Sequence, residues 1–96
     1  MKKKSTSRRR SFVVDLAGVR SAARLHAALV AQLPLPQHYG RNLDALWDCI
    51  STMEAQVILS GKDAMIDNLG SYGESLYRTL CEAAVRNPHF ELTCVN

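Results

Sequence analysis

The stretch that most constrains the fold is residues 35–50, LPQHYGRNLDALWDCI, where a proline-stiffened loop leads into an amphipathic helix. Apolar side chains recur there at the i, i+3, i+4 and i+7 spacing that places them along one face of a helix. They are Leu43, Leu46, Trp47 and Ile50. Asn42 comes directly before this stripe, and asparagine is a favoured N-cap residue. We therefore predict a helix that is capped by Asn42 and packs its apolar stripe against the core.

Two aspartates, Asp44 and Asp48, lie one turn apart on a neighbouring face of the predicted helix. Side chains at i and i+4 have Cβ atoms about 5–6 Å apart, and like charges so placed destabilise a helix by a few tenths of a kcal/mol. The helix dipole offsets part of this repulsion for Asp44, which is near the N-terminus, but not for Asp48. From spacing alone, a solvated helix face and a binding surface explain the pair equally well.

The loop before the helix carries side chains next to this acidic face. Pro36 stiffens the chain, and Gly40 allows backbone φ values that other residues disfavour. We therefore expect His38 and Tyr39 to be presented beside the two aspartates, so that the loop and the helix form one docking surface.

The rest of the chain alternates between short apolar segments and helical patterns. Strands are predicted at residues 12–16, 56–59 and 90–95, and further helices at 22–33, 62–69 and 74–86. Ser21 is the expected cap of the first helix, and Gly70 is expected to end the helix at 62–69. Strands separated by helices pair in parallel with right-handed crossovers. We therefore predict an α/β fold, a small three-stranded parallel sheet packed with about four helices.

Length and charge divide the chain into a tail and a body. Residues 1–10, MKKKSTSRRR, hold 6 of the 12 Lys and Arg residues, which leaves 6 basic against 9 acidic residues in residues 11–96. The whole chain has a formal charge of +3, but the body alone has −3. A chain of this length buries roughly 60% of its unfolded surface, which suits one core. We expect a disordered basic tail at residues 1–10 and a single acidic domain at 11–96.

Other features argue against an enzyme, a cofactor or a membrane span. Cys49, Cys81 and Cys94 are odd in number and lack a CxxC or Cys/His ligand spacing, so we interpret them as small apolar core residues in a reducing compartment. His26 and His89 are interpreted as surface or satisfied structural residues. Paired carboxylates also serve in glycoside hydrolysis, but a chain this short has little room for a walled sugar cleft. No apolar run reaches the roughly 18 residues of a membrane span. We expect no catalytic residue, no metal, no cofactor and a cytoplasmic location.

Residues 39–49, YGRNLDALWDC, resemble the hallmark YGxNLDALWDC of the barstar family, the small intracellular inhibitors of secreted microbial ribonucleases. Residues 73–83 resemble the last helix of that family and place Glu74 at its acidic start. Residues 12–33 also fit, whereas residues 51–70 match in pattern rather than in identity. The resemblance covers all but the first ten residues and implies a barstar-like fold.

The resemblance implies inhibition by occupation of a nuclease active site, with acidic side chains in place of the RNA phosphates. Asp48 would be the central anchor, with Asp44 beside it and Glu74 contributing from the last helix. The contact would also be lined by His38, Tyr39, Gly40, Asn42, Leu43 and Trp47. The implied partner is a small basic extracellular ribonuclease, barnase-like, or a related toxin. The chain itself would be a cytoplasmic immunity protein, monomeric when free.

Two residues within this surface depart from the family pattern. The position of His38 is a tyrosine in the best-known member, and histidine changes its charge within the physiological pH range. Arg41 puts a positive charge three residues before Asp44, where an inhibitor of a basic enzyme would gain from a negative one. Both differences would alter which nuclease the surface fits.

A second hypothesis places the function in the basic tail. Clustered Lys and Arg residues bind nucleic acid by releasing counterions from its phosphates. Residues 2–10 would then make the chain an RNA-associated or regulatory protein on a barstar-like scaffold. They lack the aromatic residues on which single-strand binders stack bases. Any nucleic-acid binding is therefore expected through residues 2–10 only.

The tail could also compete for the docking surface, because its positive charge is complementary to the acidic body. Deleting residues 1–10 should then strengthen binding to a basic nuclease, as measured by titration calorimetry at low salt, where such charge effects are largest. Unchanged affinity would exclude this competition.

Overall fold

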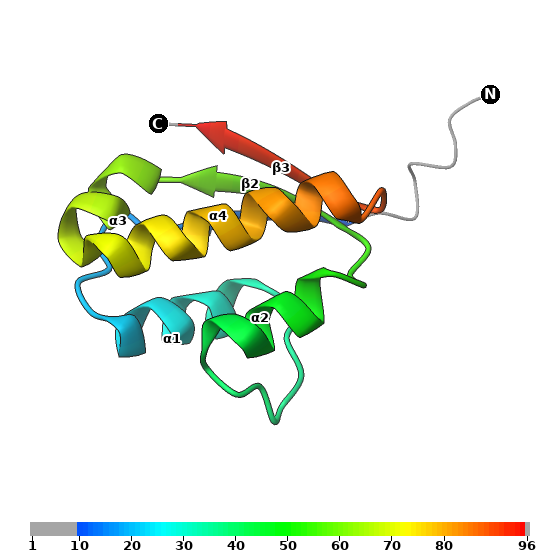
Figure 1. The fold of residues 1–96 in the computed structure, drawn as a ribbon, viewed down its shortest axis with the longest axis horizontal. Coiled ribbons are helices and arrows are strands. Elements are labelled where there is room, and N and C mark those ends of the chain that lie inside the picture. The colour runs from blue at the N-terminus through cyan, green and yellow to red at the C-terminus, as the bar shows by residue number, and fades with distance from the viewer. Residues whose placement is uncertain (1–9, 96) are drawn as a thin grey trace.

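The structure, a computed structural model, describes residues 10–95. Its elements in chain order are β1 (Arg10–Asp15), α1 (Ala22–Gln32), α2 (Leu43–Ile50), β2 (Ala55–Ser60), α3 (Lys62–Leu69), α4 (Ser71–Arg86) and β3 (Phe90–Val95) (Figure 1). The strands form one parallel sheet in the order β1-β2-β3. The predicted α/β fold is confirmed, since residues 10–95 contain three parallel strands and four helices. No helix in this range is long and apolar enough to cross a membrane.

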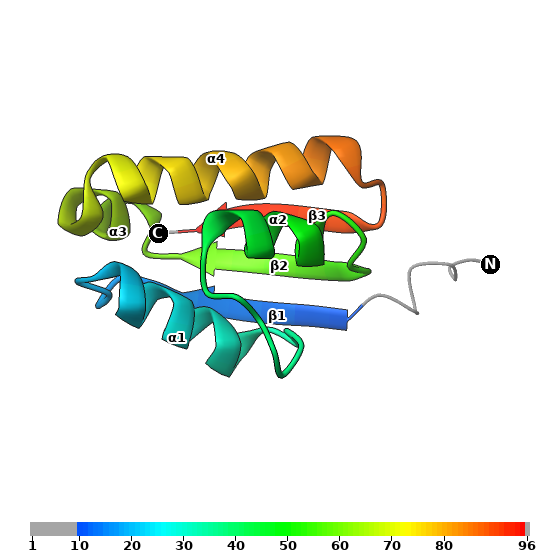
Figure 2. The same cartoon turned by 60° about the horizontal axis from the view of Figure 1, so that its bottom comes forward.

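The helices cover one face of the sheet and leave the other face open. Strand side chains alternate between the two faces, and in β2 the residues Ala55, Val57 and Leu59 are buried while those between them are half-buried. On the open face Val13, the partner of Ile58 in the ladder, is 63% exposed. Figures 1 and 2 show α1, α2 and α4 together on the covered face. The hydrophobic core therefore lies between that face and the helices.

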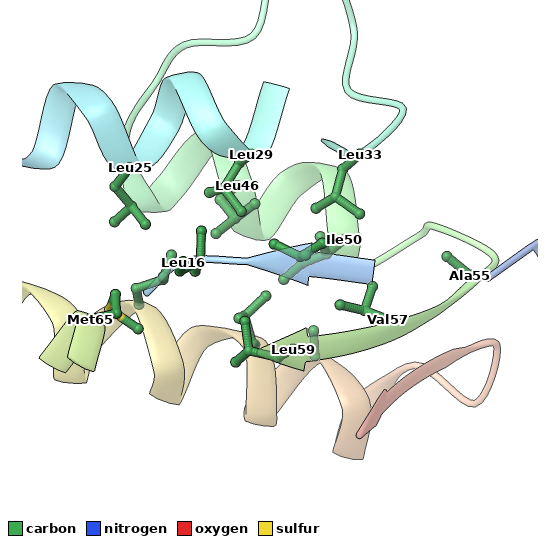
Figure 3. Close-up of a cluster of buried hydrophobic side chains, with 14 of the residues drawn as sticks. Leu16, Leu25, Leu29, Leu33, Leu46, Ile50, Ala55, Val57, Leu59 and Met65 are labelled. Atoms are coloured by element: carbon green, nitrogen blue, oxygen red, sulfur yellow. The ribbon is translucent and has the colours of Figure 1, made fainter. Parts of the chain in front are cut away.

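Helix α2 is held against this core by the predicted apolar stripe. Leu46 and Ile50 are 0% exposed, and Leu43 and Trp47 are half-buried. Figure 3 shows core side chains from α1, α2 and β2 that point toward one another: Leu25, Leu29, Leu46, Ile50, Val57 and Leu59. Burial of a leucine or isoleucine side chain contributes about 1.5–3 kcal/mol. Leu46 and Ile50 therefore fix the rotation of α2 about its own axis.

The element boundaries differ from the predicted ones at two places that matter. Helix α4 begins at Ser71 rather than at residue 74, because Gly70, with a φ of 61°, both ends α3 and precedes α4. Strand β1 begins at Arg10, which pairs with Ala55, so the prediction of a tail through residue 10 is wrong for Arg10. The rest of the predicted tail, residues 1–9, lies outside the described residues. A tail deletion should accordingly stop at residue 9.

The prediction that the cysteines are core residues is only partly correct. All three thiols are free, and Cys49 and Cys81 are half-buried, but Cys94 is exposed. The difference arises because the last three residues of the edge strand β3 are all exposed.

Asn87 ties the end of α4 to the end of α2. It is 6% exposed, and its side-chain nitrogen donates to the backbone carbonyls of Ile50 at 3.0 Å and Met53 at 2.9 Å. Its Oδ1 accepts from the backbone N–H of His89 at 2.9 Å. These bonds place α2 beside the C-terminal half of α4, as Figures 1 and 2 show.

Asn87→Ala should lower the free energy of unfolding by about 1–3 kcal/mol, because buried carbonyl groups lose their donor. Urea denaturation measures the change. Asn68→Ala is the matched control, since the exposed Asn68 donates to one backbone carbonyl, that of Val19 at 3.0 Å, and its effect should stay within about 0.5 kcal/mol. Equal losses in the two variants would show that Asn87 has no special part in joining α2 to α4.

Candidate functional site

The acidic pair lies on the outer side of α2. Successive residues of an α-helix are rotated by about 100°, so the burial of Leu46 and Ile50 turns Asp44 and Asp48 away from the core. Both aspartates are exposed, and their carboxylates make no hydrogen bond or ion pair with any residue in the range 10–95. A partner can therefore bind them without breaking a contact to any of these residues.

The first turn of α2 is capped as predicted. Asn42 has an extended backbone with a φ of −145°, and its side-chain oxygen accepts from the backbone N–H of Ala45 at 2.7 Å. Its side-chain nitrogen donates to the carbonyl of Gly40 at 3.2 Å. The Asn42 side chain thus holds the loop to the start of the helix.

The backbone at residues 40 and 41 differs from the prediction. The residue with a positive φ is Arg41, at 58°, and not Gly40. Glycine at position 40 matters for packing instead, since a Cβ there would lie 3.1 Å from the Cβ of Ala45. Gly40 therefore lets the loop approach α2 closely, and the backbone strain falls on Arg41.

Of the two aromatic residues expected beside the aspartates, only His38 is exposed. Tyr39 is 8% exposed, and its hydroxyl lies 2.7 Å from Nδ1 of His26 in α1. Burial is the main cause that raises the pKa of Tyr39 to about 12, so its hydroxyl stays protonated. Core packing and this hydrogen bond hold the Tyr39 side chain inside, so the prediction that it is presented at the surface beside the aspartates is wrong. Tyr39 instead anchors the loop. Its contact with a partner stays a prediction, since Tyr39 still lines a hollow beside Asp48.

Two hollows flank the aspartates and bring most of the predicted site residues together. The loop hollow, of about 160 Å³, is lined by Pro36, His38, Tyr39, Gly40, Ala45, Asp48 and Cys49. The helix groove, of about 310 Å³, is lined by Leu43, Asp44, Trp47, Thr79, Glu82 and Arg86. The loop, α2 and α4 thus form one surface, with Asp48 beside the first hollow and Asp44 beside the second.

Glu74 is the predicted site residue that the structure sets apart from the aspartates. It lies in the first turn of α4, beside a third hollow of about 400 Å³. That hollow is lined by Ile66, Glu74, Tyr77, Arg78 and Cys81. Glu82 lies eight residues later, about 12 Å along the helix, and it is Glu82 that shares the helix groove with Asp44.

The sequence alone does not single out the α4 residues of the helix groove. Thr79, Glu82 and Arg86 are spaced by three and four residues, which places them on one face of α4. This spacing could have predicted that the three side chains share a face. It does not reveal where α2 lies along α4, because this position depends on long-range contacts such as those of Asn87.

The charges at the helix groove can rearrange around a partner. Arg86 and Glu82 form an ion pair at 3.6 Å, but their side chains are 67% and 54% exposed, so the pair contributes at most about 1 kcal/mol. A cationic side chain of a partner could replace Arg86 beside Glu82. With Asp44 and Asp48, this gives three carboxylates able to form charge-assisted hydrogen bonds with arginine or lysine.

The loop hollow has a largely uncharged wall next to Asp48. Burial, followed by the Asp48 carboxylate, raises the pKa of the Cys49 thiol, which favours its neutral form. Within residues 10–95, no group of three or more His, Cys, Asp and Glu side chains is placed to hold a metal ion. The chemistry that the surface supports is the binding of cationic side chains through its carboxylates.

Two comparisons with known proteins agree with this geometry. Residues 9–95 match the family model described as Barstar (barnase inhibitor), a range that spans every element from β1 to β3. The chain is also 32% identical over 77 residues to the Bacillus subtilis (strain 168) protein named "Putative ribonuclease inhibitor YrdF". That alignment covers 77% of this chain and 85% of the length of the Bacillus protein.

Arg41→Gly should raise the free energy of unfolding by about 1 kcal/mol, because glycine adopts a positive φ without the steric penalty of a Cβ. Urea denaturation measures the change. Arg41→Ala is the matched control, since it removes the same charge but keeps the Cβ, and it should not stabilise the protein. If both variants were equally stabilising, the cause would be charge and not backbone strain.

Proposed function

The chain belongs to the barstar family, and we propose that it is a cytoplasmic immunity protein that inhibits a small basic ribonuclease of the barnase type. In this proposal α2 and the loop before it enter the active-site cleft of the enzyme. Asp48 and Asp44 then take the places of RNA phosphates against the enzyme's basic side chains. The chain acts by occluding the site and has no catalytic residue of its own.

The observation that supports this proposal most is that Asp44 and Asp48 are exposed, and have no ion-pair partner among residues 10–95, on a helix whose orientation is fixed by the core. A carboxylate facing an arginine forms short, often bidentate hydrogen bonds. Complementary fields also speed the encounter of two proteins, an effect known from complexes of this family. An acidic face is therefore suited to a basic active site.

The helix groove extends the acidic face toward α4. Trp47 is half-buried and lines this groove together with Asp44 and the α4 residue Glu82. Tryptophan is enriched among the residues that dominate binding energies, because its large ring loses little conformational entropy when it packs. We expect Trp47 and Glu82 to contact the nuclease together with the aspartates.

Two exposed residues would set which nuclease binds best. His38 lines the loop hollow beside Asp48, and Arg41 lies in the same loop. Arg41 brings a positive charge, and His38 an exposed aromatic ring, to the rim of the surface that carries Asp44 and Asp48. Glu74, in contrast, would contribute mainly through long-range attraction, since it lines a different hollow.

The RNA-associated alternative is favoured by no specific observation on the described residues. Its basic residues lie at positions 2–9, outside the described range, apart from Arg10, which starts β1. The inhibitor therefore remains the function that the described surface supports best.

Asp48→Ala should weaken binding to barnase by more than about 2 kcal/mol, the level expected for a charged anchor that is desolvated in a complex. Surface plasmon resonance measures the change. Asp67→Ala is the control, because it removes the same charge from an exposed position on α3 that lines neither the loop hollow nor the helix groove. Its effect should stay within about 0.5 kcal/mol.

Failure of the wild-type chain to inhibit barnase would contradict a barnase-type target. Affinity capture from the secreted proteins of the source organism then tests the inhibitor function itself. The wild-type chain should retain a small basic nuclease, and a variant carrying Asp44→Ala and Asp48→Ala should not. If the wild-type chain retains no nuclease, the inhibitor function is wrong.

A further inference from the structure

A buried histidine links the loop to α1 and to α4. His26, in α1, is 2% exposed, and both of its ring nitrogens have partners. Nδ1 lies 2.7 Å from the hydroxyl oxygen of Tyr39, and Nε2 lies 2.7 Å from that of Tyr72. Tyr39 belongs to the loop, and Tyr72 to the first turn of α4. One side chain therefore connects three segments of the chain.

A neutral imidazole ring satisfies both of these hydrogen bonds. One of its nitrogens donates and the other accepts, and each tyrosine hydroxyl can take the complementary role. The hydroxyl of Tyr39 also lies 3.5 Å from the backbone carbonyl of Asn42, at the outer limit of hydrogen-bond length. The relay, defined as Tyr72, His26 and Tyr39, thus ends at Asn42, the residue that caps α2.

Tyr39 is the most deeply buried attachment of the loop to the core, which the half-buried Leu35 also contacts. Between Pro34 and Asn42, Tyr39 is the only buried residue. Its backbone N–H also donates to the carbonyl of Pro36 at 3.0 Å. The position of Tyr39 therefore also determines where the turn at residues 36–39 lies. The place of the Tyr39 ring therefore sets the distance between His38 and Asp48 across the loop hollow.

We propose that His26 is a positioning residue of the inhibitory surface, which holds the loop through the relay in the arrangement that a nuclease binds. This inference rests on the proposed function and deepens it. His26 lies inside the protein and acts through Tyr39. A surface that is already ordered loses less entropy on binding. The relay therefore lengthens the lifetime of the complex and leaves the rate of encounter unchanged.

The surroundings of His26 favour a neutral imidazole ring. Burial first, and then the Arg41 guanidinium, lower the pKa of His26 below its ordinary value of 6.5. The titratable and charged groups that face the ring are Tyr39 and Arg41 from the loop and Tyr72 from α4, and none of them is negative at neutral pH. Protonation would make both ring nitrogens donors, so the tyrosine hydroxyl that had donated to the ring would have to redirect its proton.

The direction of the pKa change fixes the pH dependence. Because the unfolded chain binds this proton more readily than the folded chain, the contribution of His26 to stability is complete above pH 6.5. It declines as the pH falls through 6.5 toward the lower pKa of the folded state. Removal of the imidazole in His26→Gln should abolish this part of the pH profile.

Tyr72→Phe tests the relay at the end farthest from the loop. Hydrogen exchange followed by NMR should show the amides of Tyr39 and Ala45 exchanging about fivefold faster, as the loss of one hydrogen bond allows, while amides of the central strand β2 keep their rates. Tyr77→Phe is the matched control, since it is the same change in α4 at a hydroxyl that bonds to Cys94 instead. It should leave loop exchange unchanged.

The kinetics of the barnase complex give the second measurement. Tyr72→Phe should raise the dissociation rate about fivefold and leave the association rate unchanged. His26→Leu should have a larger effect than His26→Gln, whose amide can still donate to Tyr39. When the pH is lowered from about 7 to about 5.5, the loop amides of the wild-type chain should lose protection from hydrogen exchange. Those of His26→Gln should not.

Three outcomes separate the possibilities. Equal loop exchange in Tyr72→Phe and Tyr77→Phe would overturn the relay. A loosened loop with an unchanged dissociation rate of the barnase complex would overturn the positioning role. A wild-type chain that does not bind barnase would contradict the proposed function instead, and the exchange comparison, which uses no nuclease, would still decide whether the relay holds the loop.

Discussion

The packing of one side of α2 against the sheet is the constraint on which the surface depends. Leu46 and Ile50 are fully buried, so the helix cannot rotate without exposing them. This fixed orientation turns Asp44 and Asp48 outward, where no described side chain neutralises them. Asn87 then sets the position of α2 along α4 and brings Glu82 next to Asp44. The acidic surface thus results from core packing, which buries one side of α2 and leaves the charged side chains of the other side exposed.

The features that reduce stability are concentrated in this same loop and helix. The aspartates repel one another at i and i+4 spacing, and Arg41 has a positive φ. Such strain persists only where neighbouring contacts over-determine the conformation. Here these contacts are the Asn42 cap, the close approach of Gly40 to α2, and the hydrogen bond between His26 and Tyr39. An ordered acidic surface is the result, and it is what binding to a basic cleft requires.

Local features of the fold and the site were predictable from the sequence, and long-range ones were not. The Asn42 cap and the apolar stripe of α2 depend on neighbours within one or two turns, so the local sequence pattern was enough to predict them. The choice between Glu74 and Glu82 depends on how α2 lies along α4, and the burial of His26 depends on tyrosines 13 and 46 residues away. The positive φ of Arg41, and the tight fit of Gly40 against Ala45, are two further features that no sequence pattern reports.

A crystal structure of the complex with barnase tests the central claim most directly. The account predicts that the carboxylates of Asp44 and Asp48 lie within hydrogen-bond distance of basic side chains in the enzyme's active site, with Trp47 and Glu82 in the same contact. The open face of the sheet, around Val13, should remain in solvent. A complex in which the two aspartates face water while another part of the chain contacts the enzyme would contradict the account.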